Sequence, residues 1–129
     1  MDIEQYFTAF KRSIQQNPNV QFVQTPILLQ KFSQFQGRIK ARLYFWDGSQ
    51  LNVEEVVTTQ NGYPERVGYS YAYLHDEVNV FRYDNAPHFP QFATFPHHKH
   101  VGADETAEPA EQPTLKQIFR EIDEYISNL

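Results

Sequence analysis

The feature that most constrains the fold is a period-two alternation that runs from Val20 to Asn85. Apolar side chains alternate there with polar ones, and β-branched and aromatic residues are frequent. Turn signals interrupt the alternation at Asp47-Gly48 and Asn61-Gly62. The pattern predicts an antiparallel meander of about four to five strands. These strands are expected near residues 20–32, 36–46, 50–60, 67–75 and 78–84.

An amphipathic helix is predicted on each side of this region, over residues 1–17 and 114–127. Asp2 is the expected N-cap of the first helix, and Asn17-Pro18 is the expected stop signal. Thr114 and Gln117 have the spacing of a capping box at the start of the second helix. Both helices carry one apolar stripe, which we expect them to bury on the same face of the sheet. The predicted fold class is therefore α+β, as a single domain over residues 1–129.

Charge is unevenly distributed along the chain, which has 129 residues and a net charge of -5. Residues 1–102 contain equal numbers of basic and acidic side chains, so the acidic excess lies in residues 103–129. An acidic protein normally lacks the cations that bind phosphate, but here that objection applies only to the C-terminal part. The chain has no Cys, no long apolar run and no signal-peptide pattern at its first residues. We therefore expect a cytoplasmic protein without a membrane partner.

Residues 38–46 predict a sheet with two different faces. Ile39, Leu43 and their alternate neighbours form an apolar side, while Arg38, Lys40 and Arg42 form a basic side. A three-residue loop over Asp47-Gly48-Ser49 would keep the two sides separate in the next strand. In that register Leu43 faces Val53, Ile39 faces Val57, Arg42 faces Glu54, and Glu55 points into the apolar side opposite Ala41.

Tyr69, Tyr71 and Tyr73 share one side of the fourth predicted strand. With Asp76-Glu77 as the turn, Tyr71 is expected opposite Arg82 and Tyr69 opposite Asp84, on the basic face. Aromatic rings stack on bases and cations bind phosphates, so this face is a candidate site for single-stranded nucleic acid. Ordinary cross-strand packing on a solvated face is the alternative. The candidate nucleic-acid-binding residues are Arg38, Lys40, Arg42, Tyr71 and Lys99.

Residues 86–113 are rich in Pro and His and lack periodicity, which predicts either a long ordered loop or a partly disordered linker. The candidate catalytic residues are His98, His100, His88, Asp84 and Arg82. One interpretation is metal-independent RNA cleavage, in which an imidazole transfers protons while Lys99 or Arg82 stabilises charge. A second is zinc binding by His98 and His100, which point the same way in an extended segment, together with His88 or Asp84. A third is a rigid polar loop without chemistry. No cofactor and no metal are predicted as the preferred case.

Two segments carry a family resemblance: RYDNAPH at residues 82–88 and FPHHKHVG at residues 95–102. They resemble the small bacterial TumE-type toxins of toxin–antitoxin pairs, and the resemblance extends over roughly residues 36–126. It implies a toxin encoded beside a cognate antitoxin, which is then the expected protein partner, with an action on RNA or translation. The alternative is a non-enzymatic protein-binding or regulatory module.

An acidic stretch precedes the predicted second helix, formed by Asp104, Glu105, Glu108 and Glu111. One hypothesis is that this stretch lies over the basic face as an intramolecular mimic of phosphate. The other is that it only keeps the protein soluble.

Overall fold

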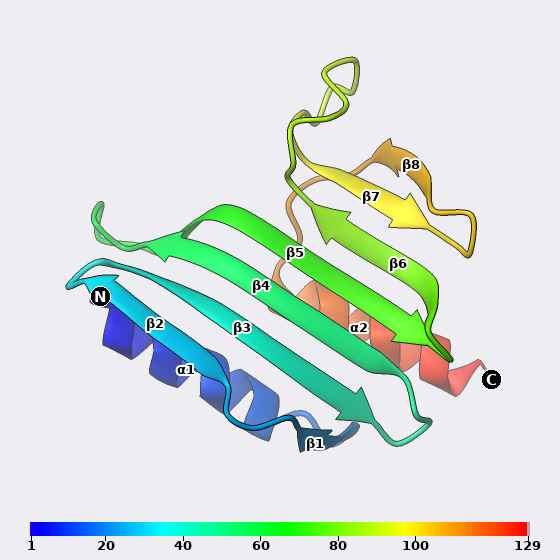
Figure 1. Cartoon of the computed structure of the whole chain (residues 1–129), viewed down its shortest axis with the longest axis horizontal. Helices are drawn as coiled ribbons and strands as arrows, with labels where there is room; N and C mark the ends of the chain where they lie inside the picture. The colour runs from blue at the N-terminus through cyan, green and yellow to red at the C-terminus, as the bar shows by residue number, and fades with distance from the viewer. Residues whose placement is uncertain (129) are drawn as a thin grey trace.

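The computed structural model describes residues 1–128, which form two helices and one antiparallel sheet (Figure 1). The helices are α1 (Ile3–Gln15) and α2 (Leu115–Ser127). The strands are β1 (Val20–Val23), β2 (Leu28–Ser33), β3 (Gln36–Phe45), β4 (Gln50–Thr58), β5 (Glu65–His75), β6 (Val78–Asp84), β7 (His98–Val101) and β8 (Thr106–Pro109). The α+β class and the meander are confirmed, but the sheet has eight strands rather than four to five.

The additional strands have two origins. The expected first strand is broken into β1 and β2, which both pair with β3, because Pro26 between them cannot donate to a ladder. The expected loop over residues 86–113 contains β7 and β8, which extend the sheet beyond β6. The sheet order is β1-β3-β4-β5-β6-β7-β8, and β2 lies beside β1 on the same edge of β3. Residues 85–97 retain the irregular structure that was predicted.

Both helices cover the same face of the sheet, behind it in Figure 1. Both predicted N-caps are confirmed. Thr114 forms the predicted capping box with Gln117 in α2, and Asp2 forms one with Gln5 in α1, where only the N-cap was expected. The covered face of the sheet and the helices form one core. Its largest fully buried side chains include Tyr71, Tyr73, Phe45, Phe81, Ile3, Ile39, Leu43, Leu51, Ile118 and Ile122. In residues 1–128, neither helix combines the length and the hydropathy that a bilayer-spanning helix requires.

The β3–β4 hairpin has the predicted faces in a different register. Its three-residue loop is Trp46-Asp47-Gly48, one residue earlier than expected, and the Phe45 amide donates to the carbonyl of Ser49. The side chain of Ser49 is buried between Asp47 and Tyr73, which fixes this residue opposite Phe45, directly before β4 begins at Gln50. Each predicted pair is therefore displaced by two residues, and the even displacement preserves both faces. Observed partners are Leu43 with Leu51, Ala41 with Val53, Arg42 with Asn52 and Ile39 with Glu55.

The β5–β6 hairpin places the tyrosine row on the opposite face from the one predicted. The turn at Asp76-Glu77 is confirmed, and both residues have positive φ, as a two-residue hairpin turn requires. A bulge beside Val80 then adds one residue to β6, so Tyr71 faces Tyr83 instead of Arg82. The predicted pairing of Tyr71 with Arg82, and of Tyr69 with Asp84, is wrong. The tyrosines are buried in the core, and Arg82 and Asp84 lie on the open face, away from the helices.

Candidate functional site

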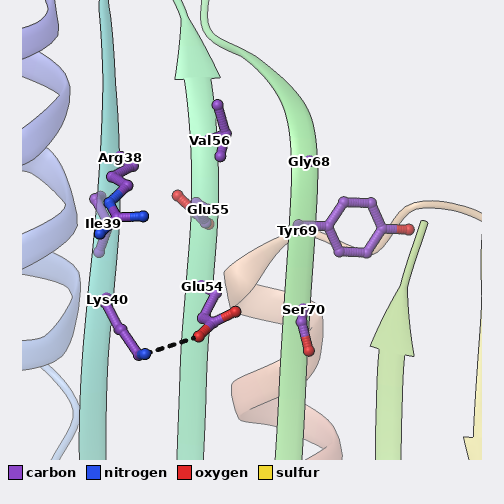
Figure 2. A pocket seen from close by; sticks show the side chains of 9 residues that line it. All are labelled: Arg38, Ile39, Lys40, Glu54, Glu55, Val56, Gly68, Tyr69 and Ser70. Atoms are coloured by element: carbon purple, nitrogen blue, oxygen red, sulfur yellow. Dashed lines mark ion pairs between the residues drawn. The ribbon is translucent and has the colours of Figure 1, made fainter. Parts of the chain in front are cut away.

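A groove runs along the open face of the sheet over β3, β4 and β5. Figure 2 shows one part of it, a depression of about 280 Å³ that Arg38 and Lys40 of β3 border. A second depression of about 460 Å³ continues along the same strands past Arg42. Both depressions are lined by Lys40, Glu54 and Ser70, so they form one continuous groove.

The groove exists because β5 presents small residues to the open face. Gly68, Ser70 and Ala72 alternate with the buried tyrosines along this strand. A β-carbon at Gly68 would meet nothing closer than Val56, at 3.8 Å, so this part of the floor has free space above it. The alternation of small and aromatic residues therefore fills the core on one side and leaves a trough on the other.

The basic stripe predicted on β3 lies along one border of the groove. Arg38, Lys40 and Arg42 are all exposed on the open face. Lys40 forms an ion pair with Glu54 at 3.3 Å, and both side chains are largely exposed, so water screens the pair and its contribution is small. Arg42 donates to Asn52 Oδ1 at 3.0 Å. The three cations therefore remain accessible to an anionic ligand.

Aromatic rings accompany this stripe on β1 and β3, whereas Tyr71 of β5, which was predicted beside it, does not. Phe22 of β1 stacks on Tyr44 of β3 with ring centroids 4.5 Å apart, and Phe22 is 52% exposed. Tyr71 is wholly buried on the helix side, where its hydroxyl donates to Glu55 and accepts from Arg66. The placement of Tyr71 on the nucleic-acid face is therefore wrong. The aromatic pair of this face, Phe22 with Tyr44, lies on β1 and β3 instead of β5.

Lys99 lies on the helix side of the sheet, whereas its predicted role in binding nucleic acid requires the open face. Its neighbours His98 and His100 face the open side of β7, whereas Lys99 Nζ lies 2.7 Å from Glu121 of α2 and over the ring of Tyr83. Burial disfavours the ammonium, but the hydrogen bonds to Glu121 and Tyr83 outweigh it, and the pKa of Lys99 is raised. Lys99 therefore fastens β7 to α2 instead of lining the groove.

Asp84, His98 and His100 meet where β6 ends and β7 begins. One ligand atom from each residue lies within 4.8 Å of the others, as the extended geometry of residues 98–100 predicts. Asp84 is directly opposite Ser70, and Arg82 is opposite Ala72, so this cluster borders the groove floor on the side away from the basic stripe. Arg82 Nε lies 3.2 Å from Asp84 Oδ2, and its Nη1 lies 2.6 Å from Glu105 Oε1.

Both imidazoles of this cluster are held in one tautomer by backbone carbonyls. His98 Nδ1 lies 3.0 Å from the carbonyl of Pro96, and His100 Nδ1 lies 3.1 Å from the carbonyl of Glu105. A carbonyl oxygen only accepts, so each Nδ1 carries a proton and donates it. The other ring nitrogen, Nε2, therefore faces Asp84 in both residues, at 2.9 Å for His98 and 3.8 Å for His100.

The members of the cluster differ in how much of each side chain is exposed to solvent. The side chain of His98 is 1% exposed, and those of His100 and Asp84 are 14% and 13% exposed. The ring of Phe89 covers both imidazoles, with its centroid 4.8 Å from that of His98 and 5.9 Å from that of His100. Four of the five candidate catalytic residues are therefore brought together, and their catalytic role stays a prediction. His88 is exposed and lies outside the group of ligand atoms.

The acidic stretch does not lie over the basic stripe, so the hypothesis of an intramolecular phosphate mimic is wrong. β8 is at the far edge of the sheet from β3, and Glu105 binds Arg82. The β7–β8 hairpin holds this segment there through regular strand pairing.

Sequence reasoning missed four features of the site: the groove over β5, the stacking of Phe22 on Tyr44, the cover by Phe89 and the contact of Glu105 with Arg82. Only the small residues of β5 had a visible signal, the alternation of Gly68, Ser70 and Ala72 with tyrosines. The other features depend on pairings between segments that are distant in the sequence.

A family model described as Toxin TumE matches residues 11–126, which include every residue of the groove and of the Asp84–His98–His100 cluster. The search of curated proteins found no match, and the search of solved structures found none either. The match covers most of the chain and confirms the resemblance carried by RYDNAPH and FPHHKHVG. The chain belongs to the TumE toxin family.

Proposed function

We propose that this chain is the toxin of a toxin–antitoxin pair and that it acts on RNA in the cytoplasm through the open face of its sheet. Membership of the toxin family implies a cognate antitoxin as partner. The observation that carries the RNA part is a single groove with three cations along one border and the Asp84–His98–His100 cluster with Arg82 along the other.

The chemistry of the groove fits a single strand of RNA. Phosphates bind exposed cations, and unpaired bases stack on aromatic rings such as Phe22 and Tyr44. Two strands, β4 and β5, separate β3 from β6, so the basic stripe and the cluster are about 14 Å apart at the usual strand spacing. A short stretch of backbone lying across the groove would therefore reach both borders.

Arg82 is the member of the cluster best placed to meet a phosphate. Its side chain is 32% exposed, beside Ala72 of the groove floor, and a guanidinium binds two phosphate oxygens at once. Asp84 and Glu105 hold it in place. In this proposal Arg82 binds the phosphodiester that is acted upon.

Induced expression without the antitoxin tests the proposal. The wild type should slow growth and alter the size profile of cellular RNA. Gly68→Val, which fills the groove floor, and Arg82→Ala should each restore growth. Arg120→Ala, at an exposed site on α2, is the matched control and should remain toxic.

Equal soluble amounts of each variant must be compared. Toxicity of Gly68→Val and Arg82→Ala equal to that of the wild type would refute the proposed site. Growth inhibition with all RNA intact would favour the alternative, a binding module that acts without turnover.

A further inference from the structure

We infer that Asp84, His98 and His100 form a binding site for one late first-row divalent cation of the zinc class. The inference rests on the geometry of these side chains and holds whether or not RNA is the target. Two imidazoles and one carboxylate are the donor set of many zinc sites that keep a fourth position for water or substrate.

The first argument is the direction of the ring nitrogens. His98 Nε2 is buried and has no hydrogen-bond partner among the described residues, although it lies 2.9 Å from Asp84 Oδ1. The distance between these two atoms suits a hydrogen bond, but the direction from the imidazole ring to the carboxylate does not. A buried polar atom without a partner is unfavourable unless something else satisfies it, and a cation placed between the two residues would do so.

The second argument is that the surroundings of all three ligands are complete. Each imidazole donates Nδ1–H to a backbone carbonyl, as metal-bound histidines usually do. Asp84 Oδ1 accepts from the amide of Ala86 at 3.0 Å, and Asp84 Oδ2 accepts from Arg82. These bonds fix the three ligands in orientation and leave both Nε2 lone pairs directed at the same space.

The third argument is the spacing of the ligand atoms. In a tetrahedral zinc site with bonds of about 2.0–2.1 Å, ligand atoms lie about 3.3 Å apart. The contacts of Asp84 with His98 and His100 measure 2.9 and 3.8 Å, on either side of that value. Side-chain adjustments of less than about 1 Å would bring these two pairs to the spacing of a zinc site.

Charge and protonation also favour a cation over a proton. With neutral imidazoles, the group formed by Asp84, Glu105 and Arg82 has a net charge of -1, which suits a divalent cation. A proton on Nε2 of His98 would satisfy that nitrogen alone. Nε2 of His100 would still lack a hydrogen bond to Asp84, because the two atoms are 3.8 Å apart. A metal ion satisfies both nitrogens.

Untagged protein, stripped with a chelator and titrated with Zn²⁺ against a coloured competitor, tests the site. We expect one tight ion per chain, and a rise in the midpoint of thermal unfolding when zinc is present. His98→Ala and Asp84→Asn should each weaken binding at least 100-fold. His88→Ala, an exposed histidine outside the cluster, should bind as the wild type does.

Binding should also weaken as the pH is lowered, because protons compete with the metal ion for the imidazoles. Co²⁺ in place of Zn²⁺ should give the visible absorption of a low-coordinate site, which His100→Ala should abolish. If a variant does not fold, the zinc titration of the wild-type protein alone tests the site. Zinc binding no tighter than that of an unrelated protein, or binding lost in His88→Ala but retained in His98→Ala, would overturn the inference.

Discussion

Glu55 shows at the scale of one residue how a carboxylate becomes part of the core. It is 3% exposed, on the helix side of β4, where it accepts hydrogen bonds from the hydroxyls of Tyr6 and Tyr71. Arg66 extends the network through Tyr71. Burial, and then the negative charge of Glu55, raise the pKa of both tyrosines, so they remain donors.

Glu55→Ala is expected to lower the free energy of unfolding by about 2–4 kcal/mol, because it leaves two buried hydroxyls without an acceptor. The control is Glu54→Ala at the next position of the same strand, which removes only the exposed pair with Lys40 and should change stability by less than about 0.5 kcal/mol. Urea unfolding of both variants measures the difference. Equal stabilities would contradict the role given to Glu55.

The inward position of Glu55 was predicted from the sequence, because it depends only on the alternation along one strand. The common direction of His98 and His100 was predicted for the same reason. The residue opposite Glu55 on β3 was predicted wrongly, as Ala41 instead of Ile39, because this pairing depends on where the hairpin loop begins. The third member of the cluster also remained open between His88 and Asp84, since only the pairing of β6 with β7 selects Asp84.

At the scale of elements, one bulged residue decides on which face of the sheet Arg82 and Asp84 lie. Val80 is the extra residue; it moves Arg82 and Asp84 to the open face and leaves Tyr71 opposite Tyr83 in the core. A bulge has no sequence signature here, so the faces of β5 and β6 could not be related from the sequence. β7 and β8 were missed because Lys, Ala, Glu and Pro are unfavourable in strands. The pairing of β7 with β6 and of β8 with β7 overrides that preference.

The buried tyrosines predict how stability depends on alkaline pH. Burial raises the pKa of Tyr69 to about 12, and it also raises the pKa values of Tyr6, Tyr71 and Tyr73. The folded state therefore holds protons that the unfolded state releases near pH 10. Stability should be complete below about pH 10 and fall as the pH rises to about 12, by about 2.7 kcal/mol for Tyr69 alone.

Absorbance of tyrosinate and circular dichroism, recorded together across this range, check the prediction. The buried tyrosines should ionise only as the protein unfolds. Ionisation of all eight tyrosines near pH 10 with the fold intact would contradict the buried placement of the row.

At the scale of the whole molecule, the two faces of the sheet differ: one is buried in the core and the other is open to solvent. The helices cover one face (Figure 1), where the tyrosine row is buried. The other face carries the groove, the basic stripe and the Asp84–His98–His100 cluster. The net charge of -5 does not oppose an RNA ligand, because the acidic excess lies C-terminal to residue 102, and Glu105 is bound to Arg82 instead of covering the stripe.

The most direct test of the account is the salt dependence of affinity for a single-stranded RNA. Replacing Arg38, Lys40 and Arg42 by Gln should lower affinity and reduce the slope of log K against log salt concentration by about 2, because three phosphate contacts are lost. Replacing Lys11, Arg12 and Lys116 by Gln changes the net charge equally, on exposed positions of the helices, and should leave the slope unchanged. Equal slopes for the two triple variants would contradict the assignment of the open face as the RNA site.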